Sequence, residues 1–298
     1  MLRFRTSGNV DIMVHAAKLV FINHLRTVAS PSSSSANLRP PSTSTSARSM
    51  NTSFDPQLHH LFQQKHSLRS KVRTSLKNMD PVLKSQQDDA IQRVVLEAPW
   101  FKNSSNICAY ISCDALREVD TSRIVSNILS NYKTDSYISF STEEDQGHVQ
   151  MKKRLYLPRV EDKNSNMKML KVSSYDDLVL SSMKILEPTL VDSSGNPRED
   201  VMQATDPVDL FIVPGLAFDK FGGRLGRSGG YYDMFLKNYQ ELIKKKNWKQ
   251  PLLVALSYSV QIIENERIPT TPYDVPVDAL VTASGFIPIS SVAFKYCH

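Results

Sequence analysis

The chain has 298 residues, 41% of them hydrophobic, so its length allows one large domain or two small ones with a sizeable core. Its formal net charge of +6 would suit a nucleic-acid-binding protein, but the charge is unevenly distributed. Residues 1–53 carry six Lys and Arg side chains against one aspartate, a net charge of +5, which leaves +1 for the rest. Because no interleaving of basic and aromatic residues remains outside this leader, we predict no nucleic-acid partner.

Residues 1–53 have the composition of an organellar targeting peptide. They are rich in Arg, Ser and Thr, and residues 9–28 mix apolar and basic side chains as an amphipathic segment does. Asp11 and Lys18 interrupt the apolar run, so no membrane-spanning helix is predicted. We predict a transit peptide or disordered leader over 1–53 and a single folded domain over 54–298. The predicted destination is the mitochondrion, with the plastid as the alternative.

Two helices are predicted at the start of the folded domain. Each is introduced by an Asp-Pro pair, Asp55-Pro56 and Asp80-Pro81, because Asp caps a helix and Pro suits its first turn. In the first helix apolar residues recur at helical spacing, beside a cationic stripe of Lys65, Arg69 and Arg73. Taken alone, such a stripe is usually a solvated helix face.

Short apolar runs alternate with helical segments along the rest of the chain. Strands are predicted over residues 106–112, 137–140, 154–157, 167–172, 210–213, 252–257 and 277–282, the last two being the final strands. A helix is predicted after Thr121, and residues 141–150 read as an exposed loop. This alternation favours parallel α/β layers, so we predict an α/β fold: a single three-layer domain with a mostly parallel sheet.

Glycines and arginines are concentrated between the strand at 210–213 and the helix that follows it. Residues 209–239 read DLFIVPGLAFDKFGGRLGRSGGYYDMFLKNY. A strand, a glycine-rich loop and a helix N-terminus present backbone N–H groups and the helix dipole to an anion. Arg224 and Arg227 add fork-shaped donors suited to phosphate oxygens. The spacing fits neither G-x-x-x-x-G-K-[ST] nor G-x-G-x-x-G, so we predict a nucleotide-phosphate site of another type.

The stretch PGLAFDKFGGRLGRSGGYYDMFL resembles the signature of the 5-formyltetrahydrofolate cyclo-ligase family, also called 5,10-methenyltetrahydrofolate synthetases. The family pattern is roughly P-G-x-x-F-D-x-x-G-x-R-L-G-x-G-x-G-Y-Y-D, and the chain departs from it at Ser228, where glycine is usual. The resemblance extends over about residues 57–282 and is dense at 209–236. It implies an enzyme that converts 5-formyltetrahydrofolate to 5,10-methenyltetrahydrofolate, with Mg²⁺ and with ATP cleaved to ADP and phosphate, through a phosphorylated formyl intermediate.

The resemblance also implies the residues of the ATP site. KHSLR is similar to the family's N-terminal K-R-x-L-R element, which implies that Lys65 and Arg69 contact the triphosphate. The resemblance of the signature implies further residues of the ATP site: Arg224, Leu225, Gly226, Arg227, Ser228, Gly229, Gly230, Tyr231 and Tyr232. Tyr232 also begins an apolar series along the helix, which favours core packing for its ring.

The folate pocket is implied by a second segment. ISCDALREVDT resembles the family's segment after its first strand, which implies that Ile111 and Glu118 line the pocket, together with Arg227 and Tyr231 from the signature. A partly buried carboxylate could accept hydrogen bonds from the N–H edge of a pterin. Tyr231 could orient the formyl oxygen or stack on the pterin.

Two carboxylates are implied as magnesium ligands. In TPYDVPVDALVT the resemblance implies Asp274 as a ligand together with Asp233, and Asp278 is the alternative for the second place. Such a pair suits Mg²⁺, which keeps several waters and binds substrate phosphates.

We expect a monomer whose partners are small molecules, 5-formyltetrahydrofolate and ATP, with no membrane association. The main alternative is a folate-binding protein that does not turn its ligand over, against which the triphosphate-shaped set of charges argues. A sugar-phosphate isomerase-like enzyme, which would need no nucleotide, and an RNA-binding protein are weaker alternatives.

Overall fold

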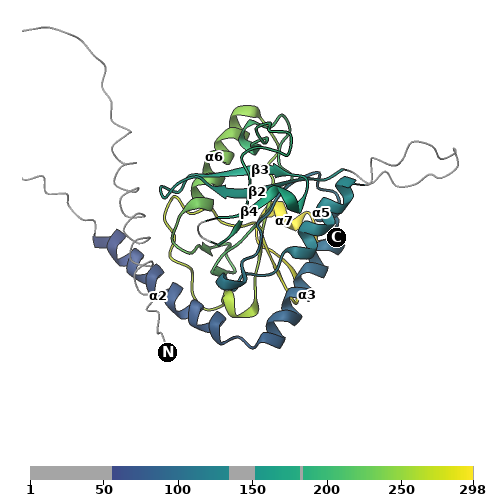
Figure 1. Ribbon diagram of the computed structural model, residues 1–298. Helices are drawn as coiled ribbons and strands as arrows, with labels where there is room; N and C mark the ends of the chain where they lie inside the picture. Colours follow the sequence, from purple (N-terminus) through teal and green to yellow (C-terminus); the bar gives the residue numbers. More distant parts are fainter. Residues whose placement is uncertain (1–55, 134–151, 182–183, 298) are drawn as a thin grey trace, which may run out of the picture.

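The computed structural model describes residues 56–133, 152–181 and 184–297 (Figure 1). Their main sheet has seven strands in the order β12-β11-β9-β6-β1-β2-β3. The strands are β1 (Asn106–Cys108), β2 (Arg154–Val160), β3 (Met167–Val172), β6 (Leu210–Val213), β9 (Leu252–Leu256), β11 (Ala279–Thr282) and β12 (Gly285–Pro288). The five central strands pair in parallel, and the edge strands β12 and β3 are antiparallel to their neighbours. The predicted α/β fold with a mostly parallel sheet is confirmed.

Helices cover both faces of this sheet. Helices α3 (Pro81–Glu97) and α5 (Ser122–Lys133) lie on one face, and α6 (Tyr231–Lys246) lies on the other (Figure 1). Because successive side chains of a strand point to opposite faces, Leu210 and Ile212 of β6 join the core beneath α3 and α5. Phe211 and Val213 join the core beneath α6. The sheet therefore lies between two hydrophobic cores, as a three-layer domain requires.

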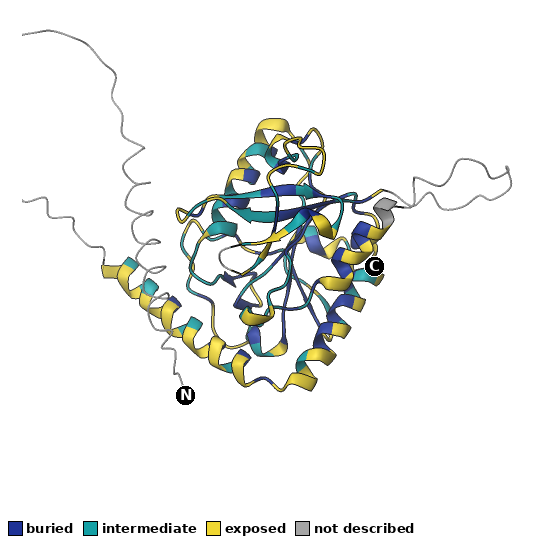
Figure 2. Ribbon diagram, in the orientation of Figure 1, coloured by how far each residue is buried: buried dark blue, intermediate teal, exposed yellow. Residues whose placement is uncertain are grey.

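Helix α2 (Pro56–Asn78) projects along the side of the domain and is mostly exposed (Figure 2). Its buried residues are Lys65, Val72 and Leu76. Charged side chains are rarely buried unless they are paired, so the burial of Lys65 indicates a partner across the domain. The short helices α4 (Pro99–Lys102) and α7 (Ser291–Phe294) complete the helical set of the described residues. None of the helices in those residues is long and apolar enough to cross a membrane.

Most predicted element boundaries match the structure. Helix α2 begins at Pro56, and Asp80 caps α3 by accepting from the backbone N–H groups of Val82 and Leu83 at 2.9 and 3.0 Å. Strand β3 has the predicted bounds. The leader (1–53), the strand at 137–140 and the loop at 141–150 lie outside the described residues.

Two predictions about strands were wrong. Strand β1 ends at Cys108 rather than near residue 112, because the chain leaves the sheet there and leads to the 3-10 turn η1 (Asp114–Leu116). The strand near 277–282 is not the last one, since β12 follows it. Gly285 and Pro288 weaken the strand signal of this segment, but proline is tolerated on an edge strand, which β12 is.

Two small ribbons flank the main sheet. One is formed by β7 (Ala217–Asp219), β8 (Arg224–Leu225) and β10 (Ile262–Ile263), in the order β10-β7-β8. The other pairs β4 (Leu178–Leu180) with β5 (Leu186–Pro188). Further 3-10 turns are η3 (Tyr175–Asp177), η4 (Val201–Gln203) and η5 (Ser259–Gln261). The first half of the glycine-rich segment is therefore a β-hairpin.

Candidate active site

The topology of the sheet places the candidate site beyond the carboxyl ends of β1 and β6. These strands are neighbours, but β1 connects through α5 to β2 on one side and β6 connects through α6 to β9 on the other. Ligands of open α/β sheets bind at such a switch in strand order, because the two loops diverge and leave a crevice. The loop after β1 carries Ile111 and Glu118, and the loop after β6 carries the glycine-rich signature.

The signature begins with a tight hairpin between β7 and β8. Gly222 has a φ of +87°, and a Cβ at this position would lie 2.7 Å from the backbone oxygen of Val277. Asp219 accepts hydrogen bonds from Phe221 N and Gly223 N, each at 2.8 Å, and from Ile268 N at 2.8 Å. This buried carboxylate therefore joins the hairpin turn to the segment that follows β10. We did not predict a role for it.

The second half of the signature leads into α6. Ser228 has a φ of +106°, a backbone region that favours glycine, which accounts for the glycine of the family pattern at this position. Gly230 precedes the helix, and no side chain of the described residues caps it. The N–H groups of the first turn of α6 therefore lack a capping side chain, as an anion site at a helix N-terminus requires.

The β2–β3 turn packs against this half of the loop. The Ser165 hydroxyl donates to the backbone oxygen of Gly229 at 2.6 Å, and the Tyr231 hydroxyl donates to that of Asp162 at 2.9 Å. The ring of Tyr232 packs against the core beneath α6, as its place in the apolar series predicted. The side chain of Leu225 is buried in the opposite core, so only its backbone can face a ligand.

Arg224 and Asp233 form a buried ion pair within the signature. Nη2 of Arg224 donates to Oδ1 of Asp233 at 2.7 Å, and Nη1 donates to the backbone oxygen of Pro214 at 3.3 Å. Nε of Arg224 is buried and has no hydrogen-bond partner among the described residues. Buried donors are nearly always satisfied, so this one indicates that water or a ligand completes the site.

Helix α2 supplies two of the predicted basic residues. Nζ of Lys65 donates to both carboxylate oxygens of Asp274, at 2.8 and 2.6 Å, and Nε of Arg69 donates to the backbone oxygen of Gly226 at 2.8 Å. Burial and the neighbouring Arg73 lower the pKa of Arg69, whereas the carboxylates of Asp274 and Asp233 oppose this effect. Arg69 thus lies within the electrostatic reach of both predicted magnesium ligands.

The two predicted magnesium ligands are adjacent. The backbone N–H of Val275, the residue after Asp274, donates to Oδ1 of Asp233 at 3.1 Å. Asp278 is engaged elsewhere: Oδ2 accepts from Leu253 N at 2.9 Å, and Oδ1 accepts from the Ser290 hydroxyl. Asp274 is engaged as well: both its oxygens accept from Nζ of Lys65, and Oδ2 also accepts from the hydroxyl of Thr271 at 2.8 Å. What distinguishes Asp274 is that it adjoins the residue that contacts Asp233. Among the described residues no group of three or more His, Cys, Asp or Glu side chains could hold a metal.

Arg227 extends from the glycine-rich loop to the segment after β1. Its Nη2 donates to the backbone oxygen of Leu116, and its Nε lies 3.4 Å from Oε1 of Glu118. Burial raises the pKa of Glu118, and the charge of Arg227 opposes the rise. Ile111 is partly buried against the core beneath α3 and α5. Arg227 therefore connects the predicted triphosphate loop with the predicted folate pocket.

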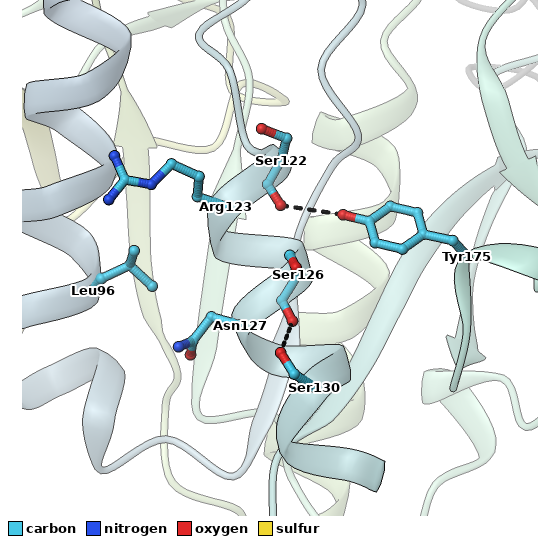
Figure 3. Close-up of a pocket in the computed structure, with 7 residues that line it drawn as sticks. All are labelled: Leu96, Ser122, Arg123, Ser126, Asn127, Ser130 and Tyr175. Carbon is cyan, nitrogen blue, oxygen red and sulfur yellow. Dashed lines mark hydrogen bonds between the residues drawn. The ribbon is translucent and has the colours of Figure 1, made fainter.

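An open hollow in the described residues lies away from this constellation. It has a volume of about 580 Å³ and is lined by Leu96, Arg123, Tyr175 and polar residues of α5 (Figure 3). The Tyr175 hydroxyl donates to the backbone oxygen of Ser122 at 3.1 Å across it. None of the predicted site residues lines it. The hollow therefore does not overlap the candidate site, which is the convergence of charged groups beyond β1 and β6.

Comparison with known proteins addresses the family directly. Residues 133–283 match the model of the 5-formyltetrahydrofolate cyclo-ligase family. Over 244 residues the chain is 56% identical to the mitochondrial 5-formyltetrahydrofolate cyclo-ligase of Arabidopsis thaliana, an alignment that covers 82% of this chain and 83% of the relative. The chain belongs to the 5-formyltetrahydrofolate cyclo-ligase family.

More distant cyclo-ligases agree with this assignment. The enzyme of Mus musculus is 27% identical over 223 residues, which cover 73% of this chain and 92% of the relative. The NMR structure of Aquifex aeolicus 5,10-methenyltetrahydrofolate synthetase superposes with a TM-score of 0.55 at 27% identity, covering 76% of this chain and 93% of that one. The family is named for its enzymatic activity, and the resemblance read from the signature is confirmed.

Proposed function

We propose that this chain converts 5-formyltetrahydrofolate to 5,10-methenyltetrahydrofolate with Mg²⁺ and with cleavage of ATP to ADP and phosphate. The observation that carries the proposal is a continuous set of charged contacts. Lys65 pairs with Asp274, Val275 bonds to Asp233, and Asp233 pairs with Arg224. Helix α2, the 274–275 loop and the glycine-rich loop, far apart in the sequence, thus meet at one point.

The proposed triphosphate site uses backbone N–H groups of the signature loop together with cationic side chains. Lys65, Arg69 and Arg227 supply charge around the γ-phosphate, and the buried Nε of Arg224 is a donor that still lacks an acceptor. Guanidinium groups suit this role because they remain charged when buried and offer several donors in one plane.

Asp233 and Asp274 are the residues that would hold a magnesium ion. Within the described residues the hydrogen bonds of Asp233 go to Oδ1, which leaves Oδ2 for a metal. Mg²⁺ characteristically takes one or two carboxylates and completes its shell with water and phosphate oxygens. When bound, it would neutralise part of the triphosphate charge. Without the ion, Arg224 pairs with Asp233 and Lys65 pairs with Asp274.

The formyl oxygen is a poor leaving group, so the reaction must first convert it to a phosphate, which leaves readily. The formyl oxygen attacks the γ-phosphorus of ATP, and ADP leaves. Nitrogen 10 then attacks the resulting iminium phosphate and loses its proton, after which phosphate departs. Such phosphoryl transfer depends on positioning and on neutralisation of charge. Arg227 is suited to both tasks, since it lies between the phosphate loop and the segment carrying Glu118.

The direct test is turnover. We expect the full-length chain to produce the methenyl absorbance from 5-formyltetrahydrofolate only when ATP and Mg²⁺ are both present. A non-catalytic folate-binding protein would bind 5-formyltetrahydrofolate in equilibrium dialysis, with or without ATP, and would produce no such absorbance.

Replacing Asp233 by asparagine is expected to raise the Mg²⁺ concentration for half-maximal activity at least about tenfold, because one charged ligand is lost. A magnesium titration of the initial rate measures this. Asp278→Asn is the matched control, since its carboxylate bonds to β9 and Ser290, and we expect no shift in the magnesium requirement. An unchanged titration for Asp233→Asn would mean that this carboxylate only stabilises the start of α6.

The raised pKa of Glu118 predicts an acid limb in the pH profile. A carboxyl group with a raised pKa keeps its proton to higher pH, so binding of a pterin N–H edge should weaken as the pH falls through that pKa. We expect kcat/KM for 5-formyltetrahydrofolate to rise with pH through this limb, and Glu118→Gln to remove it. A limb that persists in the variant belongs to another group. Ionisation of Glu118 is less favourable in the folded chain, so stability decreases as the pH rises through the same interval.

We propose a mitochondrial destination for this chain. The relative from Arabidopsis thaliana is named as mitochondrial, and residues 1–53 have the basic, hydroxyl-rich composition of a transit peptide. A fluorescent protein fused after residue 53 should accumulate in mitochondria. Accumulation in plastids would select the alternative.

A further inference from the structure

The segment that carries Glu118 is held in an uncommon backbone conformation by other elements. Arg117 has a φ of 53°, in the left-handed region that few residues other than glycine adopt. Its guanidinium donates to the backbone oxygens of Leu76 and Met79, at 3.0 and 2.9 Å, at the end of α2. Such a conformation persists only where surrounding contacts impose it. The place of Glu118 therefore depends on long-range contacts.

The hydroxyl of Tyr258 contacts the backbone of Glu118 from the sheet side. Tyr258 follows β9 and is fully buried. Its Oη lies 2.9 Å from the backbone oxygen of Glu118 and 2.6 Å from Oδ1 of Asp88. A phenol has a single proton, which these two acceptors share. The same Oδ1 accepts from the backbone N–H of Asp120 at 2.8 Å. Tyr258 and Asp88 thus hold the backbone on both sides of Val119.

The charge of Asp88 is balanced within α3. Nζ of Lys84, one turn earlier, lies 2.9 Å from Oδ2 of Asp88 and 5.7 Å from the centre of the Tyr258 ring. Burial, with the hydrogen bond to Asp88 as a second cause, raises the pKa of the Tyr258 hydroxyl far above its ordinary value, so it remains a protonated donor. The cluster is a satisfied buried network, which rigidifies the backbone that it joins.

We propose that Tyr258 and Asp88 are positioning residues for Glu118, fixing the carboxylate where it meets the reduced folate. The inference rests on the proposed role of Glu118 in substrate binding. It assigns a function to two residues that touch neither the predicted triphosphate site nor the predicted metal ligands. We therefore expect their effect chiefly on the folate side, because they reach the triphosphate site only through the contact of Glu118 with Arg227. A displacement of a binding group by about 1 Å is enough to cost one or two orders of magnitude.

Tyr258→Phe in the full-length chain tests the proposal, because it removes the hydroxyl and keeps the ring. We expect KM for 5-formyltetrahydrofolate to rise roughly tenfold, with KM for ATP changed less than about twofold. Tyr239→Phe is the matched control, since it removes another buried hydroxyl, which accepts from Val208 N at 2.7 Å beneath α6. We expect it to leave both KM values unchanged.

A second pair of variants separates positioning from loss of structure. Asp88→Asn keeps an oxygen acceptor for Tyr258 and Asp120 N, so it should retain more affinity for 5-formyltetrahydrofolate than Asp88→Ala. Parallel increases in both KM values, an unchanged folate KM in Tyr258→Phe, or equal affinities of the two Asp88 variants would overturn the proposal.

Equilibrium dialysis of 5-formyltetrahydrofolate separates this inference from the proposed reaction. A wild-type chain that binds the folate without turning it over would refute the reaction. Weaker binding by Tyr258→Phe would then still support the positioning role. A wild-type chain that does not bind the folate would overturn both.

Discussion

Arg227→Ala is expected to lower kcat by about two to three orders of magnitude, the loss seen when one donor that stabilises transition-state charge is removed. The guanidinium reaches from the glycine-rich loop to Leu116 and Glu118, so it can face the transferred phosphate and the formyl group together. Initial rates at saturating ATP, Mg²⁺ and 5-formyltetrahydrofolate measure the loss. If Arg227→Ala turned over at the wild-type rate, the assignment of Arg227 to the site would be wrong.

Two further variants accompany this test: one asks whether the charge or the planar guanidinium group of Arg227 is needed, and the other is a control. Arg227→Lys keeps a cation but not the planar donors, and we expect it to recover only part of the activity. Arg123→Ala removes an exposed guanidinium that lies 3.5 Å from Asp89, remote from the loop, and should have no effect on kcat.

Arg227→Ala has a second expected consequence, for the pH profile. Arg227 opposes the rise in the pKa of Glu118, so its removal should move the acid limb of kcat/KM to higher pH. A limb that stays in place would mean that the two side chains do not interact in the working enzyme.

Local signals in the sequence predicted most of the elements. Asp80 followed by Pro81 marks the start of α3 because cap and first turn are encoded by neighbouring residues. The apolar run 210–213 marks β6, and the glycine-rich segment after it marks the loop, for the same reason. The hairpin formed by β7 and β8 within that loop escaped prediction because its strands have only three and two residues.

The contacts that assemble the site join residues far apart in the chain. Lys65 and Asp274 are 209 positions apart, and Arg227 and Leu116 are 111 apart. Sequence patterning assigns faces and element types, but pairing across the domain depends on strand order. The family resemblance supplied most of these residues as candidates. It gave no role to Tyr258 or Asp88, because neither residue belongs to a recognisable motif. Their role is apparent only from the structure, in which the Tyr258 hydroxyl lies 2.6 Å from Oδ1 of Asp88.

Asp219→Ala is expected to destabilise the fold by about 4 kcal/mol, because it leaves three backbone N–H groups without their acceptor. Those of Gly223 and Ile268 are buried, and Asp219 itself is only 1% exposed. Urea unfolding followed by circular dichroism measures the change. The matched control is Asp192→Ala. That carboxylate makes similar bonds, to Ser194 N and Asn196 N at 2.9 Å each, but in a solvent-exposed turn where water replaces it. We expect little change in its unfolding midpoint.

A double-mutant cycle with Gly223 shows whether Asp219 acts through the hairpin. A Cβ at Gly223 would lie 2.4 Å from Oδ2 of Asp219, so Gly223→Ala should be strongly destabilising in the wild-type background. In the Asp219→Ala background the clashing carboxylate is gone, and the same substitution should cost much less. Residues in direct contact couple in this way, whereas independent sites add. If the two effects on stability were additive, Gly223 would be required for another reason, such as the close approach of a ligand to the backbone of the loop.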